Sequence, residues 1–245
     1  MRLKVLATGT VALALLIGVS YLPTAAGWPV LAMVLLLLAA FAAGWPRLLK
    51  VPSPNPVSLV IFLASAATAL LAYVEEPLPG LLWLAPAVGI GTIVMFLTQL
   101  FRGANATSRL ESAASGMAGL VIACLGAGWI GVGDDPAWRD LALIGALTIL
   151  AAAIPGVLRW PDRIAFPLGF VLAVLVGGAA SIVNSAVNVV PGLVLGAACG
   201  LVVVGSRAML VSAGGPRNSV QMLAAATAPV LVCGSVVWYA QLLIA

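Results

Sequence analysis

Two arginines and a glycine pair lie close together near the end of the sequence, in a stretch without acidic residues. Guanidinium groups match the oxygens of a phosphate, and glycine exposes backbone N–H groups that can bind the same oxygens. The stretch therefore predicts a site for a phosphate or a lipid headgroup. A loop that only touches anionic headgroups is the alternative. The candidate residues are Arg207, Gly214, Gly215, Arg217, Asn218 and Ser219.

A second group of polar residues follows a helical spacing. Ser181, Asn184, Ser185 and Asn188 recur at i, i+3, i+4 and i+7, so they would share one face of a continuing helix. The pattern predicts a polar wall of an outward-facing cavity. A helix end wetted by headgroups would give the same pattern.

Few residues could hold a metal or a cofactor. The sequence has no histidine, and Cys124, Cys199 and Cys233 lie in apolar runs without CxxC spacing, so zinc and haem sites are excluded. The acids Glu75, Glu76, Asp134, Asp135 and Asp140 have oxygen ligands for a divalent cation, but topology alone also places acids on an outer face. We predict no metal site and no cofactor.

The elements that must position these residues are membrane spans. Of the 245 residues, 63% are hydrophobic and 7% are charged, whereas about a quarter of a soluble domain is charged. Because a span needs about 20 apolar residues, we predict an all-α bundle of nine spans that forms a single domain over residues 1–245. The predicted spans are 4–22, 28–45, 57–74, 80–101, 116–132, 141–158, 164–182, 191–210 and 222–244.

The distribution of charge predicts how the spans are oriented. With the N-terminus in the cytoplasm, every basic residue except Arg139 lies inside, as the positive-inside rule requires. The C-terminus then lies outside. The first span, which precedes Pro23-Thr24-Ala25-Ala26, has an alternative interpretation as a cleaved secretory signal. The inside residues are Arg2, Lys4, Arg47, Lys50, Arg102, Arg109, Arg159, Arg163, Arg207 and Arg217.

Small residues and tryptophans mark two kinds of helix surface. Gly192, Gly196 and Gly200 form a small-xxx-small ridge, and Ala173, Gly177 and Ser181 form another. We expect these ridges to pack within the chain, against a second copy or against a partner subunit. All seven tryptophans fall near span ends, where we expect them to anchor the protein at the membrane interface.

The last loop also carries the outline of a known signature. Ser206-Arg207, Ser212-Ala213-Gly214-Gly215 and Asn218-Ser219 stand where that signature has Lys-Arg, Pro-Gly-His-Gly-Gly and Asp-Ser. In this respect the chain resembles the CDP-diacylglycerol synthase (phosphatidate cytidylyltransferase) family, which implies a polytopic inner-membrane fold with a cytoplasmic active site. The family's Lys-Asp pair, histidine and both aspartates are missing. Because metal-dependent nucleotidyl transfer needs carboxylates, the resemblance does not carry over the activity.

These features favour a protein that binds lipid rather than one that transforms it. No charged residue lies at the centre of a predicted span, which argues against a proton-driven transporter, a pump or a voltage-gated channel. We predict a non-catalytic lipid-binding or assembly component of envelope biogenesis in a bacterial inner membrane. Its partners would be anionic lipid headgroups and no nucleic acid. The alternatives are a permease or flippase for a neutral or lipidic substrate, and a lipid-phosphate enzyme related to the cytidylyltransferases.

Overall fold

The chain is helical throughout the part that the structure describes. The computed structural model describes residues 2–22, 27–74, 81–102, 107–133, 136–158, 160–184 and 187–244, and no strand occurs among them. Each predicted span overlaps one α-helix, so the all-helical fold class is confirmed. The elements are α1 (Arg2–Ser20), α2 (Trp28–Leu48), α3 (Pro54–Val74), α4 (Leu84–Leu100), α5 (Arg109–Leu125), η1 (Gly126–Gly133), α6 (Pro136–Ala153), η2 (Ile154–Gly156), α7 (Asp162–Val183), α8 (Val189–Ser212) and α9 (Ser219–Ile244), where η denotes a 3-10 segment.

The helices have the length and composition of membrane spans. Within the described residues, 8 helices are long and apolar enough to cross a bilayer. The shorter apolar helix α4 has 17 residues, which corresponds to about 25 Å along its axis. A typical hydrocarbon core is about 30 Å thick. The fold is therefore compatible with a multi-pass membrane protein.

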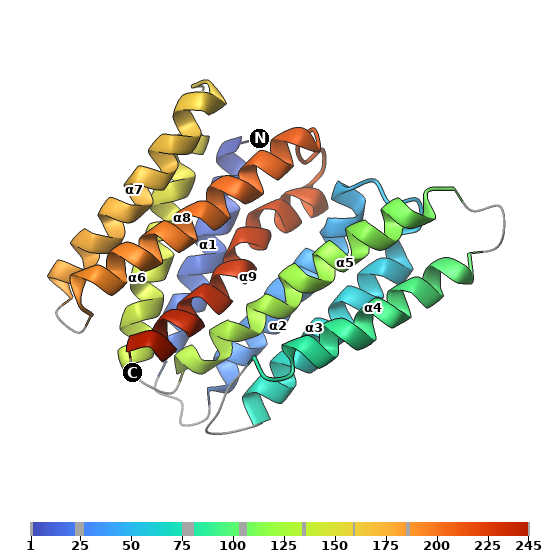
Figure 1. Ribbon diagram of the computed structural model, residues 1–245, viewed down its shortest axis with the longest axis horizontal. Coiled ribbons are helices and arrows are strands. Elements are labelled where there is room, and N and C mark those ends of the chain that lie inside the picture. Colours follow the sequence, from blue (N-terminus) through green and yellow to red (C-terminus); the bar gives the residue numbers. More distant parts are fainter. Residues whose placement is uncertain are drawn as a thin grey trace.

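The bundle consists of two outer groups of helices on either side of the central helix α9 (Figure 1). Helices α3, α4 and α5 contact one another on one side, and α6, α7 and α8 do so on the other. Between them, α9 contacts α1, α2, α5, α6 and α8. The N-terminus and the C-terminus lie at opposite ends of the bundle (Figure 1).

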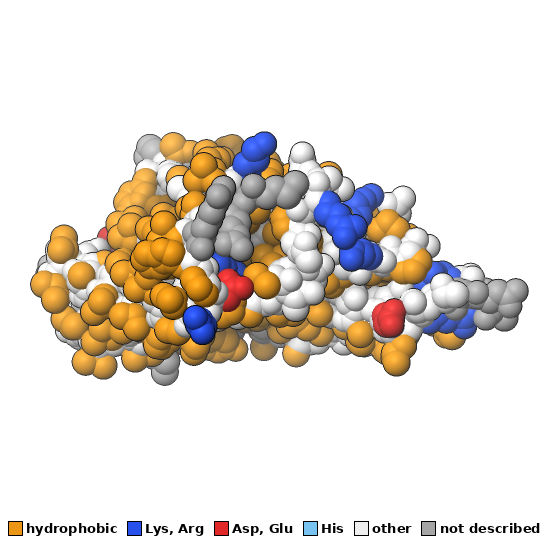
Figure 2. All heavy atoms as spheres, turned by 90° about the horizontal axis from the view of Figure 1, so that it is seen from above, with side chains coloured by type: hydrophobic (Ala, Val, Ile, Leu, Met, Phe, Trp, Pro, Cys, Tyr) orange, Lys and Arg blue, Asp and Glu red, His pale blue; other side chains and the backbone are white. Residues whose placement is uncertain are grey.

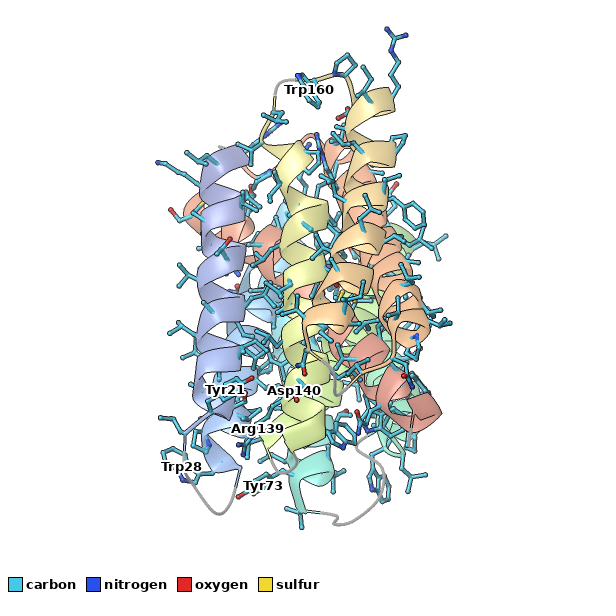
Figure 3. All side chains as sticks on the ribbon, turned by 90° about the vertical axis from the view of Figure 1, so that its left-hand side faces the viewer. Tyr21, Trp28, Tyr73, Arg139, Asp140 and Trp160 are labelled. Carbon is cyan, nitrogen blue, oxygen red and sulfur yellow. The ribbon has the colours of Figure 1, made fainter. Side chains whose placement is uncertain are left out.

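Basic side chains gather at one end of the bundle, which we call the basic end. Figure 2 shows this end with several groups of lysine and arginine side chains. Arg139 and Asp140 lie at the opposite end, together with Tyr21, Trp28 and Tyr73 (Figure 3). The described basic residues near the helix ends that meet there are Lys4, Arg47, Lys50, Arg102, Arg109, Arg163, Arg207 and Arg217.

The fifth span differs from the prediction in both its start and its shape. The helix already begins at Arg109, and after Leu125 it continues as the 3-10 segment η1. The reason lies in the glycines of η1, which let its backbone approach α9. A Cβ built on Gly128 would lie 2.5 Å from the carbonyl carbon of Gly234. Ser235 Oγ then donates a hydrogen bond of 2.7 Å to the carbonyl oxygen of Leu125, where the α-helix ends.

Three tryptophans are part of the core, so the prediction that all of them anchor the protein at the interface was wrong for these three. Trp129 is fully buried, and Trp45 and Trp238 are 4% and 7% exposed. The Trp129 indole N–H donates to the carbonyl oxygen of Val230 at 2.8 Å, and that of Trp45 donates to Ser115 at 2.9 Å. Both indoles therefore join helices that are far apart in sequence.

The two predicted ridges of small residues face each other along the α7–α8 contact. A Cβ built on Gly196 would overlap the carbonyl oxygen of Ala173 and would lie 3.1 Å from the Cα atom of Val174. A Cβ on Gly177 would overlap the carbonyl oxygen of Gly192 in the same way. The two backbones thus touch directly, and both ridges are covered within one chain.

We expect Gly196→Ala to destabilise the bundle, because the added methyl group meets the backbone of α7. Overpacking of this kind costs about 1–3 kcal/mol. Gly205→Ala is the matched control in the same helix, since a Cβ there meets nothing within 4 Å. Thermal unfolding in detergent measures both variants. Equal midpoints would show that the close α7–α8 contact does not form.

Candidate functional site

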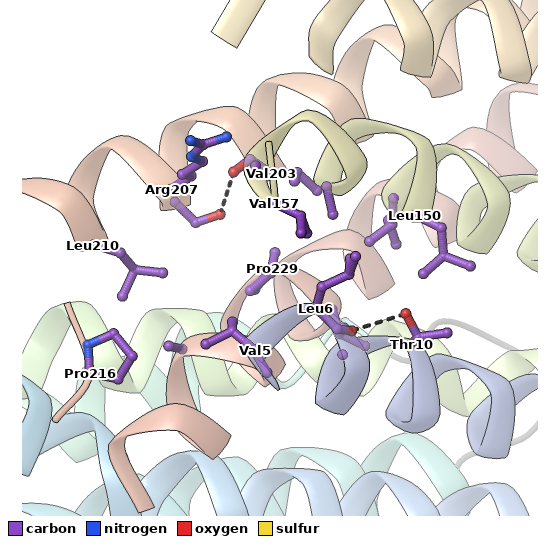
Figure 4. Close-up of a pocket in the computed structure, with 18 of the residues that line it drawn as sticks. Val5, Leu6, Thr10, Leu150, Val157, Val203, Arg207, Leu210, Pro216 and Pro229 are labelled. Carbon is purple, nitrogen blue, oxygen red and sulfur yellow. Dashed lines mark hydrogen bonds between the residues drawn. The ribbon is translucent and has the colours of Figure 1, made fainter. Parts of the chain in front are cut away.

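A cavity of about 470 Å³ lies between α1, α6, α8 and α9 at the basic end (Figure 4). Most of its lining is apolar. The two hydroxyl groups in its wall turn back onto their own helices: Thr10 Oγ1 donates to the carbonyl oxygen of Leu6 and Ser206 Oγ to that of Val202. The lining includes Val5, Leu6, Gly9, Thr10, Leu13, Ile149, Leu150, Ala153, Gly156, Val157, Val203, Ser206, Arg207, Leu210, Val211, Gly214, Gly215, Pro216, Ala225, Ala226, Pro229 and Val230.

The cavity extends from the basic end to about the middle of the helices. Its lining runs from Val5 to Leu13 on α1 and from Val203 to Val211 on α8. Eight residues of helix correspond to about 12 Å. Half of a hydrocarbon core is about 15 Å, so the cavity is roughly one leaflet deep. Its size also lies in the usual range for ligand pockets.

Arg207 is the charged residue in the wall of the cavity. Its Nη2 atom forms an ion pair with Oδ1 of Asp162, the first residue of α7, at a distance of 3.1 Å. The guanidinium carbon is 5.3 Å from the centre of the Phe166 ring. A Cβ on Gly156 would lie 2.9 Å from Nη1 of Arg207, so this glycine makes room for the guanidinium group. The stem of Arg207 therefore lines the cavity while its charge is held against the start of α7.

The glycine pair of the predicted phosphate site caps the C-terminus of α8. Gly214 and Gly215 have φ angles of 83° and 70°. The N–H of Gly214 donates to Val211 at 3.1 Å, and that of Gly215 donates to Leu210 at 2.9 Å. This is the Schellman arrangement, in which a left-handed glycine satisfies the last carbonyl groups of a helix. The two N–H groups are used by the cap, so they do not form the phosphate cradle that the sequence suggests.

Asn218 has a similar role at the start of α9. Its Oδ1 atom accepts a hydrogen bond of 2.9 Å from the N–H of Gln221, and Gln221 Oε1 accepts one of 2.7 Å from the N–H of Arg217. This pair resembles a capping box. Gln221 Nε2 also donates to the carbonyl oxygen of Arg47, which joins α9 to α2. The side chains of Arg217 and Ser219 are exposed and are not in the cavity lining.

The predicted polar wall does not form a single helical face, because α7 ends at Val183. Asn184 follows with an extended backbone, and Asn188 precedes α8 and is exposed. Ser181 is buried and donates to the carbonyl oxygen of Gly177. Ser185 lies outside the described residues. None of the described members of this group lines the cavity.

No group of three or more histidine, cysteine, aspartate or glutamate residues could hold a metal ion within the described part of the chain. Cys124, Cys199 and Cys233 are free and buried. The acidic residues at 75, 76, 134 and 135 lie outside the described residues, whereas Asp140 is on α6 at the end opposite the basic one.

Several residues of the cavity were missed by the sequence analysis. Gly9 and Thr10 lie on α1 and Gly156 lies on η2, and only the tertiary structure brings these elements together. Gln221 had a recognisable signal, because Asn218 and Gln221 have the spacing of a capping box.

Comparison with known proteins adds no relative: no protein-family model, curated protein or solved structure matches the chain. The resemblance of residues 206–219 to the cytidylyltransferase signature stays a prediction. In the structure these residues are the last turns of α8, its cap and the start of α9.

Asn218→Ala tests whether this residue caps α9. Losing the side-chain acceptor should lower the free energy of unfolding by about 1 kcal/mol. Ser219→Ala changes the adjacent exposed residue and should leave stability unchanged. Thermal unfolding in detergent gives the comparison. If both variants match the wild type, the hydrogen bond to Gln221 does not stabilise the helix.

Proposed function

We propose that this protein binds an anionic membrane lipid, with an acyl chain in the cavity and the headgroup at the basic end. The observation that carries the proposal is the cavity itself, which is mostly apolar, about one leaflet deep and lined at its basic end by Arg207. A lipid in the adjacent leaflet has the same division into a polar end and an apolar chain.

Charge near the opening of the cavity supports an anionic headgroup. Lys4 directly precedes the lining residue Val5, and Arg217 directly follows the lining residue Pro216. Near an anionic bilayer surface each such residue contributes about 1 kcal/mol of attraction. Lys4 and Arg217 are therefore the headgroup contacts that we propose. Arg207 lines the cavity with its stem, and Gly214, Gly215 and Asn218 act as helix caps.

The arrangement of the acidic residues at the basic end supports binding of a lipid without its chemical conversion. The described acids there are Glu111 at the start of α5 and Asp162 at the start of α7. Asp162 forms an ion pair with Arg207. Metal-dependent phosphoryl or nucleotidyl transfer relies on carboxylates that act together on metal ions. Formation of CDP-diacylglycerol from CTP and phosphatidic acid by the purified protein would overturn this part of the proposal.

The shape of the cavity favours holding a lipid over transporting one. Its lining reaches Leu13, Val203 and Val230 but does not continue to the opposite ends of α1, α8 and α9. A permease would need a route past the middle of the membrane. We therefore propose a lipid-binding or assembly component of the bacterial cell envelope.

The proposal includes an orientation, with nine spans, the N-terminus and the basic end in the cytoplasm, and the C-terminus outside. It rests on the positive-inside rule and on the basic side chains at one end of the bundle. The position of the two termini at opposite ends agrees with an odd number of spans.

Cysteine labelling tests this orientation. Arg217→Cys at the basic end should react with a membrane-impermeant maleimide only after the membrane is opened. Asn188→Cys at the other end should react in intact cells. Both positions are exposed, and the native cysteines are buried. The reverse pattern would place the basic end outside.

A photoactivatable lipid tests the cavity. Phosphatidylglycerol with a diazirine on its acyl chain should label the segments around Leu13, Val203 and Val230 in liposomes. Gly9→Leu should reduce this labelling about fivefold, because its side chain fills part of a closely bounded space. Phosphatidylcholine with the same chain should label more weakly than phosphatidylglycerol.

Gly18→Leu is the control for this substitution. Gly18 is on the same helix, and a Cβ there meets nothing within 4 Å. Gly18 is exposed and does not line the cavity. Equal labelling of the Gly9→Leu and Gly18→Leu variants would mean that the lipid lies on the outer surface and that the cavity does not bind it.

A further inference from the structure

Helix α1 is a wall of the cavity that is one helix thick. One of its faces carries Val5, Leu6 and Gly9, together with Thr10 and Leu13, and lines the cavity. The side chains of Leu3, Val11 and Leu15 are 64%, 57% and 51% exposed on its surface. In a bilayer these side chains would contact lipid tails. Only α1 therefore separates this side of the cavity from the hydrocarbon.

Helix α1 packs less closely on its neighbours than α9 packs on α2, and its described side chains form no hydrogen bond to another helix. It contacts α2, α6 and α9, but its described side-chain hydrogen bonds all stay within α1: Thr8 to Lys4, Thr10 to Leu6 and Ser20 to Ile17. At the α1–α9 contact a Cβ on Gly9 would lie 3.5 Å from the carbonyl oxygen of Ala226, an ordinary van der Waals distance.

The α2–α9 contact provides the contrast. A Cβ on Gly44 would overlap the carbonyl oxygen of Val220 and would lie 2.6 Å from Cβ of Ala224. Gln221 on α9 also bonds to the carbonyl oxygen of Arg47 on α2. Thus α9 is fixed to α2 by direct backbone packing and a hydrogen bond, whereas α1 rests on α9 through looser contacts.

We infer that α1 is a lateral gate and that the ligand is a lipid of the surrounding leaflet, which enters from the side when α1 moves away from α9. This inference rests on the proposed lipid binding and names the source of the ligand. Moving α1 away breaks no described hydrogen bond between helices and exposes apolar side chains only to lipid tails. In hydrocarbon such an opening costs little, because apolar surface there is not driven together by water. The acyl chain never has to cross water.

A reversible crosslink tests the gate. In the double variant Gly9→Cys and Ala226→Cys the Cβ atoms would be 4.0 Å apart, within the range of about 3.5–4.5 Å that disulfides require. The diazirine phosphatidylglycerol is loaded into the reduced protein, which is then oxidised or kept reduced. Excess unlabelled phosphatidylglycerol in nanodiscs is added, and the label that remains is measured after irradiation at successive times.

We expect release to be about tenfold slower in the oxidised protein, since gating motions set release rates when they precede dissociation. Reduction should restore the fast rate. The reduced form is a matched control because it has the same atoms in the cavity. The single variants Gly9→Cys and Ala226→Cys should not respond to oxidation.

The outcomes separate the gate from the site. Equal release rates in the oxidised and reduced forms would overturn the gate and leave lipid binding intact. Absence of labelling in the wild type would overturn lipid binding itself. If the two thiols do not join, α1 does not lie against α9 there, and the gate is overturned.

If the double variant does not fold, Gly9→Ala provides a second test. Its methyl group would tighten the α1–α9 contact and should slow release about twofold, whereas Gly18→Ala should have no effect. Equal release from both alanine variants would again overturn the gate.

Discussion

In hydrocarbon, helices gain little by burying apolar side chains against one another, so they associate mainly through packing at short range. Glycine supplies that packing in this bundle. Gly177 and Gly196 bring the backbones of α7 and α8 into contact, Gly44 does so for α2 and α9, and Gly128 does so for η1 and α9. The contacts of Gly44 and Gly128 fix α9 at the centre of the molecule. The cavity occurs where such packing is missing, between α1 and the helices that the glycines hold together.

The ends of the helices account for most of the polar residues that first suggest chemistry. Gly214 and Gly215 satisfy the last carbonyl groups of α8. Asn218 accepts from the N–H of Gln221 in the first turn of α9, and Gln221 accepts from the N–H of Arg217 just before the helix. Phosphate binding and helix capping use the same donors and the same residue types. Sequence alone cannot separate the two roles, because both place glycine and asparagine next to a helix terminus. Arg207 differs, since its stem lines the cavity.

The spans could be predicted because the membrane imposes a length and a composition on each one. Their ends were less accurate where charge and helix overlap. The predicted span 116–132 leaves out Arg109 and Glu111, yet α5 begins at Arg109. The stripe from Ser181 to Asn188 follows a helical spacing, but α7 ends at Val183. The cavity has no signature in the sequence, since its walls come from four helices and consist mainly of residues that are common throughout the chain. Its lining depends on how those helices pack.

Charge and cavity depth together restrict what this fold can hold. The basic residues mark one end of the bundle, and the cavity opens near that end and stops about one leaflet deep. A water-soluble anion would contact the basic residues but not the apolar lining, and a neutral hydrocarbon would contact the lining but not the basic residues. A lipid with an anionic headgroup contacts both. Because α1 is the thin and loosely packed wall, the same lipid can reach the cavity from the leaflet in which it already lies, with its headgroup at the basic end throughout.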